Sequence, residues 1–326
     1  MFPLWLLGVL GVLPISEEMV RSSVEKGVKR LETASASYIK NRTCFSCHHQ
    51  AMPVMALASA KERGFTVDAM NFEKQVKYTL DFFSAKVKDI SEGRGIGGAN
   101  TTAAYALLTF ELAQHPADAT TDALVDFLVK KQASNGSWAA TTNRPPSEGS
   151  LFTTGALSVG VLKAYKAKDE GERADKIAKA RENGLAFLEK AEVKTTEDRV
   201  FKIWGLLAGG ADKEMIAEAR DDLQKQQRPD GGWAQLDELK SDAYATGAAL
   251  VVLQKAGLAV DSAAYRAGVR FLVLNQDVSG GWIVPTRSRP IQTFFDNGDP
   301  GGKGQFISTA ATGWAVTALV ATISKK

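Results

Sequence analysis

The sequence predicts an all-α protein of repeated helix pairs, because one motif recurs three times with the same internal spacing. In each copy a Gln is followed four residues later by a Gly and two residues after that by a Trp: Gln132–Trp138, Gln227–Trp233 and Gln276–Trp282. A Leu lies four residues before each Gln, and a Thr-Gly segment of small residues follows each Trp. A unit that recurs in this way is typical of repeat architectures.

The residue types of this motif suit the end of a helix. The Gln amide can reach backbone groups that lack helical partners. The Gly permits a positive φ, and the Trp buries a large ring while its one N–H finds an acceptor. The alternative is three unrelated glycine turns with a Trp nearby, which the identical spacing disfavours.

The spacing also indicates how many units there are. Gln132 and Gln227 lie 95 residues apart, whereas Gln227 and Gln276 lie 49 apart. We therefore expect a degenerate unit over 184–207, which lacks the motif. Each repeat needs its neighbours to bury its apolar face, so residues 16–326 are expected to form one domain of about six helix pairs.

Caps and apolar spacing predict the helices at the start of the chain. Ser16 caps a first helix, in which apolar residues recur at helical spacing: Val20, Val24, Val28 and Leu31. Residues 52–60 predict a second helix with Pro53 in its first turn, and residues 72–88 an amphipathic one.

Later segments follow the same pattern of helices and loops. Gly93–Gly98 is expected to be a loop rather than a phosphate site, because no strand precedes it and no Lys-Ser/Thr follows. The charged stretch 164–179 predicts a solvated helix surface or loop. Further helices are expected over 101–108 and 117–131 and from Thr154, Thr246 and Thr312.

A long insert follows Trp282. It runs through Arg287 and Phe294 to Lys303 and gathers two aromatic residues, two acids and two arginines. Long loops without structure of their own are often functional. The alternative is a surface Ω-loop.

The motif resembles the Gln–Trp repeat of the squalene–hopene and oxidosqualene cyclases, a superfamily related to the β-subunits of protein prenyltransferases. The resemblance covers roughly residues 20 to 326. It implies an α/α toroid, with inner and outer rings of helices around a central cavity. Aromatic residues of the second helices would line that cavity: Tyr105, Phe152, Trp204, Tyr244 and Trp314.

Composition excludes one class of partner. The net charge of +3 is small and evenly spread, so nucleic acid is not expected as a partner. A hydrophobic content of 44% with 24% charged residues is typical of soluble globular domains.

The first fifteen residues are apolar, and the first charge in the chain is Glu17. About 20 residues are needed to span a bilayer, so the stretch is short for a membrane span. It resembles the apolar part of a secretory signal, and the alternative is a buried N-terminal segment. We expect a periplasmic or secreted bacterial protein, with membrane association only through this segment if it is retained.

Cys44-Phe-Ser-Cys47-His48 matches the attachment pattern of c-type haem. Two thiols add to the two vinyl groups, and the imidazole that follows ligates iron. The chain's two cysteines both lie here, in the first repeat. We expect covalent haem c with His48 as an axial ligand, and an exported protein fits this because attachment occurs outside the cytoplasm in bacteria. Candidates for a sixth ligand are His49, Met52, Met55 and His115.

Three other interpretations of this cluster remain open. Cys44 and Cys47 could form a disulfide or act as a dithiol. They could bind zinc together with a histidine, although a structural zinc needs four ligands. The cluster could also have arisen by chance.

The resemblance also implies what a cyclase would need. Those enzymes protonate an alkene or epoxide with an Asp kept acidic by its neighbours, usually within Asp-x-Asp-Asp. This chain lacks that motif, and Asp242 is the nearest positional analogue. A prenyltransferase β-subunit would need zinc held by well-separated Asp, Cys and His, and no Cys lies late in the chain.

The sequence therefore predicts an exported toroid that carries one c-type haem. Its expected function is electron transfer or haem-dependent redox chemistry, with a redox partner protein and a cavity for an apolar ligand. One alternative is a cyclase-like enzyme that acts on an isoprenoid through Asp242. The other is a haem-free binding scaffold.

Overall fold

The computed structural model describes residues 15–166, 171–289 and 293–324. The predicted signal-like segment, apart from Ile15, lies outside these residues. No helix within them is long and apolar enough to cross a membrane.

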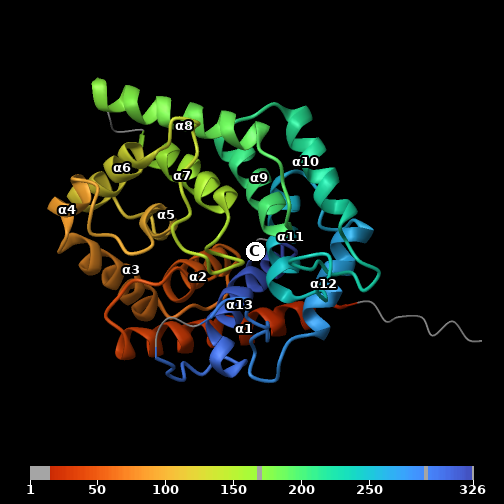
Figure 1. The fold of residues 1–326 in the computed structure, drawn as a ribbon. Coiled ribbons are helices and arrows are strands. Elements are labelled where there is room, and N and C mark those ends of the chain that lie inside the picture. The colour runs from red at the N-terminus through yellow and green to blue at the C-terminus, as the bar shows by residue number, and fades with distance from the viewer. Residues whose placement is uncertain (1–14, 167–170, 290–292, 325–326) are drawn as a thin grey trace, which may run out of the picture.

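The described chain folds into two concentric rings of helices, as the repeats predict (Figure 1). Outer and inner helices alternate along the chain as six pairs. The outer helices are α1 (Glu17–Asn41), α3 (Ala69–Ser84), α6 (Ala119–Lys131), α8 (Glu172–Lys190), α10 (Lys213–Lys225) and α12 (Ala263–Leu274). The inner helices are α2 (Met52–Glu62), α5 (Ala99–Leu112), α7 (Leu151–Lys166), α9 (Thr196–Gly209), α11 (Ala243–Lys255) and α13 (Gln305–Val320).

The inner ring is closed. Each inner helix contacts the next one along the chain, and α13 contacts α2. Inner helices are buried on nearly every side: α5 is buried without a break from Asn100 to Phe110. Outer helices bury one stripe, and in α10 that stripe is reduced to Leu223. A helix that is apolar all round belongs in a core, and an amphipathic one covers it.

The Gln of each motif ties one outer helix to the next. Gln276 Nε2 donates to Gly280 O at 2.8 Å within its own turn and to Ser23 O of α1 at 2.9 Å. Gln132 and Gln227 make the same pair of bonds, the second of them to Ala180 of α8 and Ala264 of α12. The third copy thus joins the last outer helix to the first and closes the outer ring.

The Trp of each motif fastens the same turn to the end of the preceding outer helix. In every copy its Nε1 donates at 2.8 Å to the carbonyl of the Leu that lies four residues before the Gln: Leu128, Leu223 and Leu272. All three indoles are buried. The predicted roles of Gln and Trp are confirmed, and the Gln proves to link helices as well as end one.

Two predicted segments differ in detail. The degenerate unit at 184–207 is the pair α8 and α9, in which a capping box between Thr195 and Asp198 starts the inner helix without the motif. The amphipathic segment 72–88 is two helices, α3 and the short α4 (Val87–Ser91). The chain turns between them, where the Lys86 N–H bonds to Phe83 O.

The motif glycine permits a test of this packing. Gly280 has φ +89°, and a Cβ there would lie 2.6 Å from Lys26 O of α1. Gly257 has a similar φ of +93° with nothing within 4 Å. Alanine at either position incurs about 1–2 kcal/mol from the left-handed backbone, and Gly280→Ala adds overpacking of about 1–3 kcal/mol. Chemical denaturation should show a clearly larger loss for Gly280→Ala, and equal losses would contradict this packing.

Candidate functional site

A cavity of about 620 Å³ opens at the end of the toroid where the inner helices begin. Its walls come from the segment before α2, the first turns of α5 and α13, and the loop before α7. Cys44, Cys47, His48 and His49 all line it. We call this cavity the cysteine pocket.

The local fold presents the motif to this cavity. The chain leaves α1 at Arg42 in extended conformation and re-enters helix through a π-helical turn, Cys47–Ala51, that continues into α2. Gln50 Oε1 accepts the backbone N–H of Ser46 at 2.9 Å and holds the start of that turn. Cys44 and Cys47 do not form a disulfide, and Cys44 Sγ lies 3.3 Å from the Tyr38 hydroxyl.

Glu148, which the sequence did not single out, lies beside the motif. Its side chain is 2% exposed and forms an ion pair with Arg144. The Cys47 thiol is a neighbour of this carboxylate, and each affects the pKa of the other. Burial, with Glu148 next in effect, raises the pKa of Cys47 well above its usual value, so Cys47 is held as a thiol rather than a thiolate.

His48 is a neutral imidazole. Burial, assisted by the Arg144 charge, lowers its pKa to about 3. Its Nδ1 is buried, has no hydrogen-bond partner among the described residues and lies 3.7 Å from Glu148 Oε1. The ring packs 5.2 Å from that of Phe306, centroid to centroid. A neutral imidazole is the form that ligates metal ions.

His49 is held in the wall of the same pocket. Its Nδ1 lies 3.4 Å from Ser46 Oγ, its Nε2 contacts the Asn297 amide, and the ring stacks on Tyr38 at 4.4 Å. Asn297 belongs to the long insert, which thus covers the motif. Both ring nitrogens of His49 already have partners.

The mouth of the pocket is positively charged. Arg42, Arg289 and Lys303 line it, and Glu148 is the one carboxylate among its described lining residues. Helices α5 and α13 begin there at Gly98 and Gly304 without a side-chain cap. Free backbone N–H groups at helix starts favour anionic groups.

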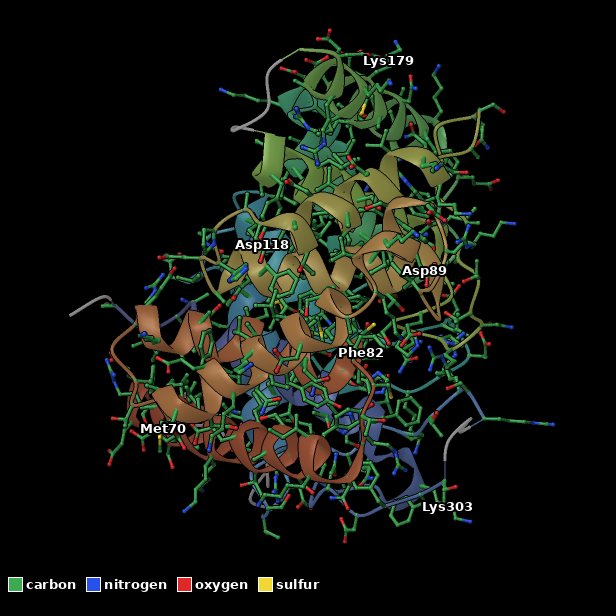
Figure 2. All side chains as sticks on the ribbon, turned by 90° about the vertical axis from the view of Figure 1, so that its left-hand side faces the viewer. Met70, Phe82, Asp89, Asp118, Lys179 and Lys303 are labelled. Atoms are coloured by element: carbon green, nitrogen blue, oxygen red, sulfur yellow. The ribbon has the colours of Figure 1, made fainter. Side chains whose placement is uncertain are left out.

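The other sixth-ligand candidates lie elsewhere. Met52 is buried against Gly313 of α13. Met55 lines a second cavity at the opposite end of the inner helices. His115 lies between α5 and α6 and pairs with Asp118 at 3.1 Å. Figure 2 views the toroid from the side and shows Asp118 well to the left of Lys303, which lines the cysteine pocket.

The expected aromatic lining needs a correction. Of the five residues, Trp204 alone lines a described cavity, the second one, of about 680 Å³. Tyr105, Tyr244 and Trp314 are fully buried and fill the toroid between the two cavities. Phe152 packs against Phe187 of the outer helix α8. The Trp314 ring meets those of Trp204 and Tyr244, with centroids 6.0 and 6.4 Å apart, because the inner helices that carry these rings pack closely.

A protonatable carboxyl lies within that packed centre. Glu197 of α9 accepts hydrogen bonds from the hydroxyls of Thr153 at 2.9 Å and Tyr244 at 3.3 Å. Burial raises its pKa to about 8. It lines neither described cavity, and no motif in the sequence marked it.

Asp242 has a structural role. One carboxylate oxygen caps α11 by accepting the Ala245 N–H at 2.9 Å, and the other accepts Gln235 Nε2 at 2.9 Å. It lines neither described cavity. Burial raises its pKa to about 6.

The described residues hold no group of three or more His, Cys, Asp or Glu side chains placed to bind a metal ion. Zinc at the cysteines therefore stays a prediction, without a ligand set among these residues.

Comparisons with known proteins agree with the fold. The family model of the squalene-hopene cyclase C-terminal domain matches residues 157–326. Among solved structures, the type II terpene cyclase MstE from Scytonema is 16% identical with a TM-score of 0.60, over 93% of this chain and 98% of that one. An MstE variant in complex with geranylgeranyl dihydroxybenzoate is 15% identical with a TM-score of 0.61, over 94% and 97%.

A protein from Actinoplanes is similar at 14% identity and a TM-score of 0.59, over 93% of this chain and 100% of that one. No curated protein matches the sequence. Structural likeness at these identities shows the fold alone.

The capping role of Asp242 can be tested by measuring the free energy of unfolding. Asp242→Ala removes the cap and should lower the free energy of unfolding by about 1 kcal/mol, whereas Asp242→Asn keeps a capping oxygen and should lose less. Because the folded pKa is raised, the wild type should also lose stability relative to the Asn variant as pH rises from about 4 to about 6. Equal losses in both variants would contradict the capping role.

Proposed function

Since this chain belongs to the squalene-hopene cyclase C-terminal domain family, we propose that it uses the toroid of that family to hold a covalent haem c for electron transfer or haem-dependent redox chemistry. One observation carries the proposal. Cys44, Cys47 and His48, in the order and spacing of haem attachment, line one cavity as two thiols and an imidazole.

The chemistry of the pocket fits such a group. Phe45, Phe82 and Phe306 supply apolar wall, as a macrocycle would need. The Arg289 and Lys303 side chains and the uncapped start of α5 suit the carboxylates at its edge. A bound haem would supply a one-electron redox centre, and the protein's part is to bind and orient it.

The proposal includes export. Residues 1–15 would serve as the secretory segment, because covalent attachment takes place outside the bacterial cytoplasm. A redox partner protein would exchange electrons at the cationic mouth of the pocket, where Arg42, Arg289 and Lys303 lie.

Covalent attachment can be tested directly. The full chain, made with export and a cytochrome c maturation system, should give a haem c spectrum in alkaline pyridine that survives acid–acetone extraction. The matched Cys44→Ser, Cys47→Ser double variant should give none after extraction. Folded wild-type protein without haem would contradict the proposal, and so would haem that extraction removes.

Isoprenoid binding is the second candidate function. Family membership favours it, as does the likeness to a type II terpene cyclase whose variant was solved with geranylgeranyl dihydroxybenzoate. Cyclisation has less support. Asp242 lines neither described cavity, and Glu148, the one carboxylate among the described residues of the cysteine pocket, is paired with Arg144. The Arg144 charge favours the ionised form of this carboxyl, against the effect of its burial, and an ionised carboxylate has no proton to donate to carbon.

The haem-free Cys44→Ser, Cys47→Ser variant distinguishes isoprenoid binding from isoprenoid cyclisation. In equilibrium dialysis it should bind geranylgeranyl dihydroxybenzoate if the pocket accepts a prenyl chain, and Phe306→Asp should abolish that binding because a charge then enters the apolar wall. Chromatography should show only unchanged compound. A cyclised product that disappears in Asp242→Asn would contradict our assignment of Asp242 and favour the cyclase.

A further inference from the structure

We infer that Glu148 is the positioning residue for His48: in the haem-loaded protein its Oε1 would accept the Nδ1–H of that imidazole, which would fix the tautomer and leave Nε2 as the ligating nitrogen. The inference rests on the proposed haem function and names a residue that the attachment motif does not contain. Ligating histidines almost always donate their other N–H to a carboxylate, a carbonyl or water, and this outer partner tunes the metal.

The Nδ1 of His48 is buried and has no hydrogen-bond partner among the residues that the structure describes. A buried ring nitrogen without a partner destabilises the fold. Glu148 Oε1 lies 3.7 Å away. A small rotation of either side chain would bring the two atoms within hydrogen-bond distance, about 2.7–3.2 Å.

Glu148 is itself held firmly. Two backbone hydrogen bonds between Arg144 and Glu148 close the loop that carries both residues. The other carboxylate oxygen, Oε2, pairs with the Arg144 guanidinium and accepts from Thr142 Oγ1 at 3.3 Å. Oε1 is therefore the oxygen turned toward His48, on a side chain that is 2% exposed.

Haem attachment would change the donors around this carboxylate. The Cys47 thiol and the Glu148 carboxylate affect each other's pKa, so the two groups are neighbours. A thioether sulfur has no proton to donate, so the attached form would offer the carboxylate no donor at that position. The His48 N–H would then join Arg144 and Thr142 as a donor to Glu148.

A purely structural role for Glu148 is the competing explanation. In that case the carboxylate serves only to neutralise the buried Arg144, and its loss would change the potential only through space, by removal of a nearby charge. A carboxylate acceptor makes the imidazole more electron-donating and stabilises the oxidised metal, so the inference requires a higher potential without the carboxylate. The Nδ1–Oε1 distance in the loaded protein then separates this effect from the effect of charge alone.

The test compares Glu148→Gln with wild type in the haem-loaded full chain, by redox titration. Glutamine keeps the shape and an acceptor but removes the charge. We expect haem still attached and a potential at least about 59 mV higher, the one-electron equivalent of a tenfold change in relative stability. The matched control is Glu197→Gln, another buried carboxyl that does not contact His48, and it should leave the potential unchanged.

The possible results distinguish failure of the role inferred for Glu148 from failure of the proposed haem function. Haem-loaded Glu148→Gln with the wild-type potential overturns the inference and leaves the haem proposal standing. Wild-type protein without haem overturns the proposal itself. If the potential rises, or if Glu148→Gln does not fold, a crystal structure of the loaded wild type decides: an Nδ1–Oε1 distance within hydrogen-bond range supports the inference, and another acceptor for Nδ1 overturns it.

Discussion

The structure depends on the bond between a motif glutamine and the next outer helix. In a closed toroid the last outer helix packs against the first, so residues from the two ends of the chain must contact each other. The bond from Gln276 to Ser23 O does this at the seam, and Gly280 allows the two backbones to approach without a Cβ between them. The same device joins two earlier pairs of outer helices, which explains why the spacing recurs without change.

Closure of the ring determines where the site lies. All inner helices run in the same direction, so the segments that precede them meet at one end. The Cys44–His49 segment, the Arg144–Glu148 loop and the long insert share no sequence pattern, yet they form one pocket there. The same geometry brings the first turns of α5 and α13 and the side chains of Arg42, Arg289 and Lys303 to the pocket that the cysteines line. The packed rings of Tyr105, Tyr244 and Trp314 separate this pocket from the second cavity.

Periodic features could be predicted from the sequence, whereas contacts across the ring could not. The Gln–Gly–Trp spacing predicts the local turn that ends each outer helix, and its recurrence predicts repeated helix pairs. The structure confirms a toroid of six such pairs. Glu148 and Glu197 were missed because each is a lone acid whose importance comes from burial against distant elements. The aromatic residues were assigned to a cavity because a buried ring and a lining ring have the same local sequence. Asp242 precedes a helix, and from sequence alone a cap and a catalytic acid at that position look alike.

The central claim is that the two cysteines carry a covalent haem. The most direct measurement is mass spectrometry of the tryptic peptide 43–61, which contains Cys44, Cys47 and His48, from protein made with a cytochrome c maturation system. Our account predicts a peptide heavier by one haem, with neither cysteine open to alkylation. An unmodified peptide in which both thiols alkylate, from folded and exported protein, would contradict it.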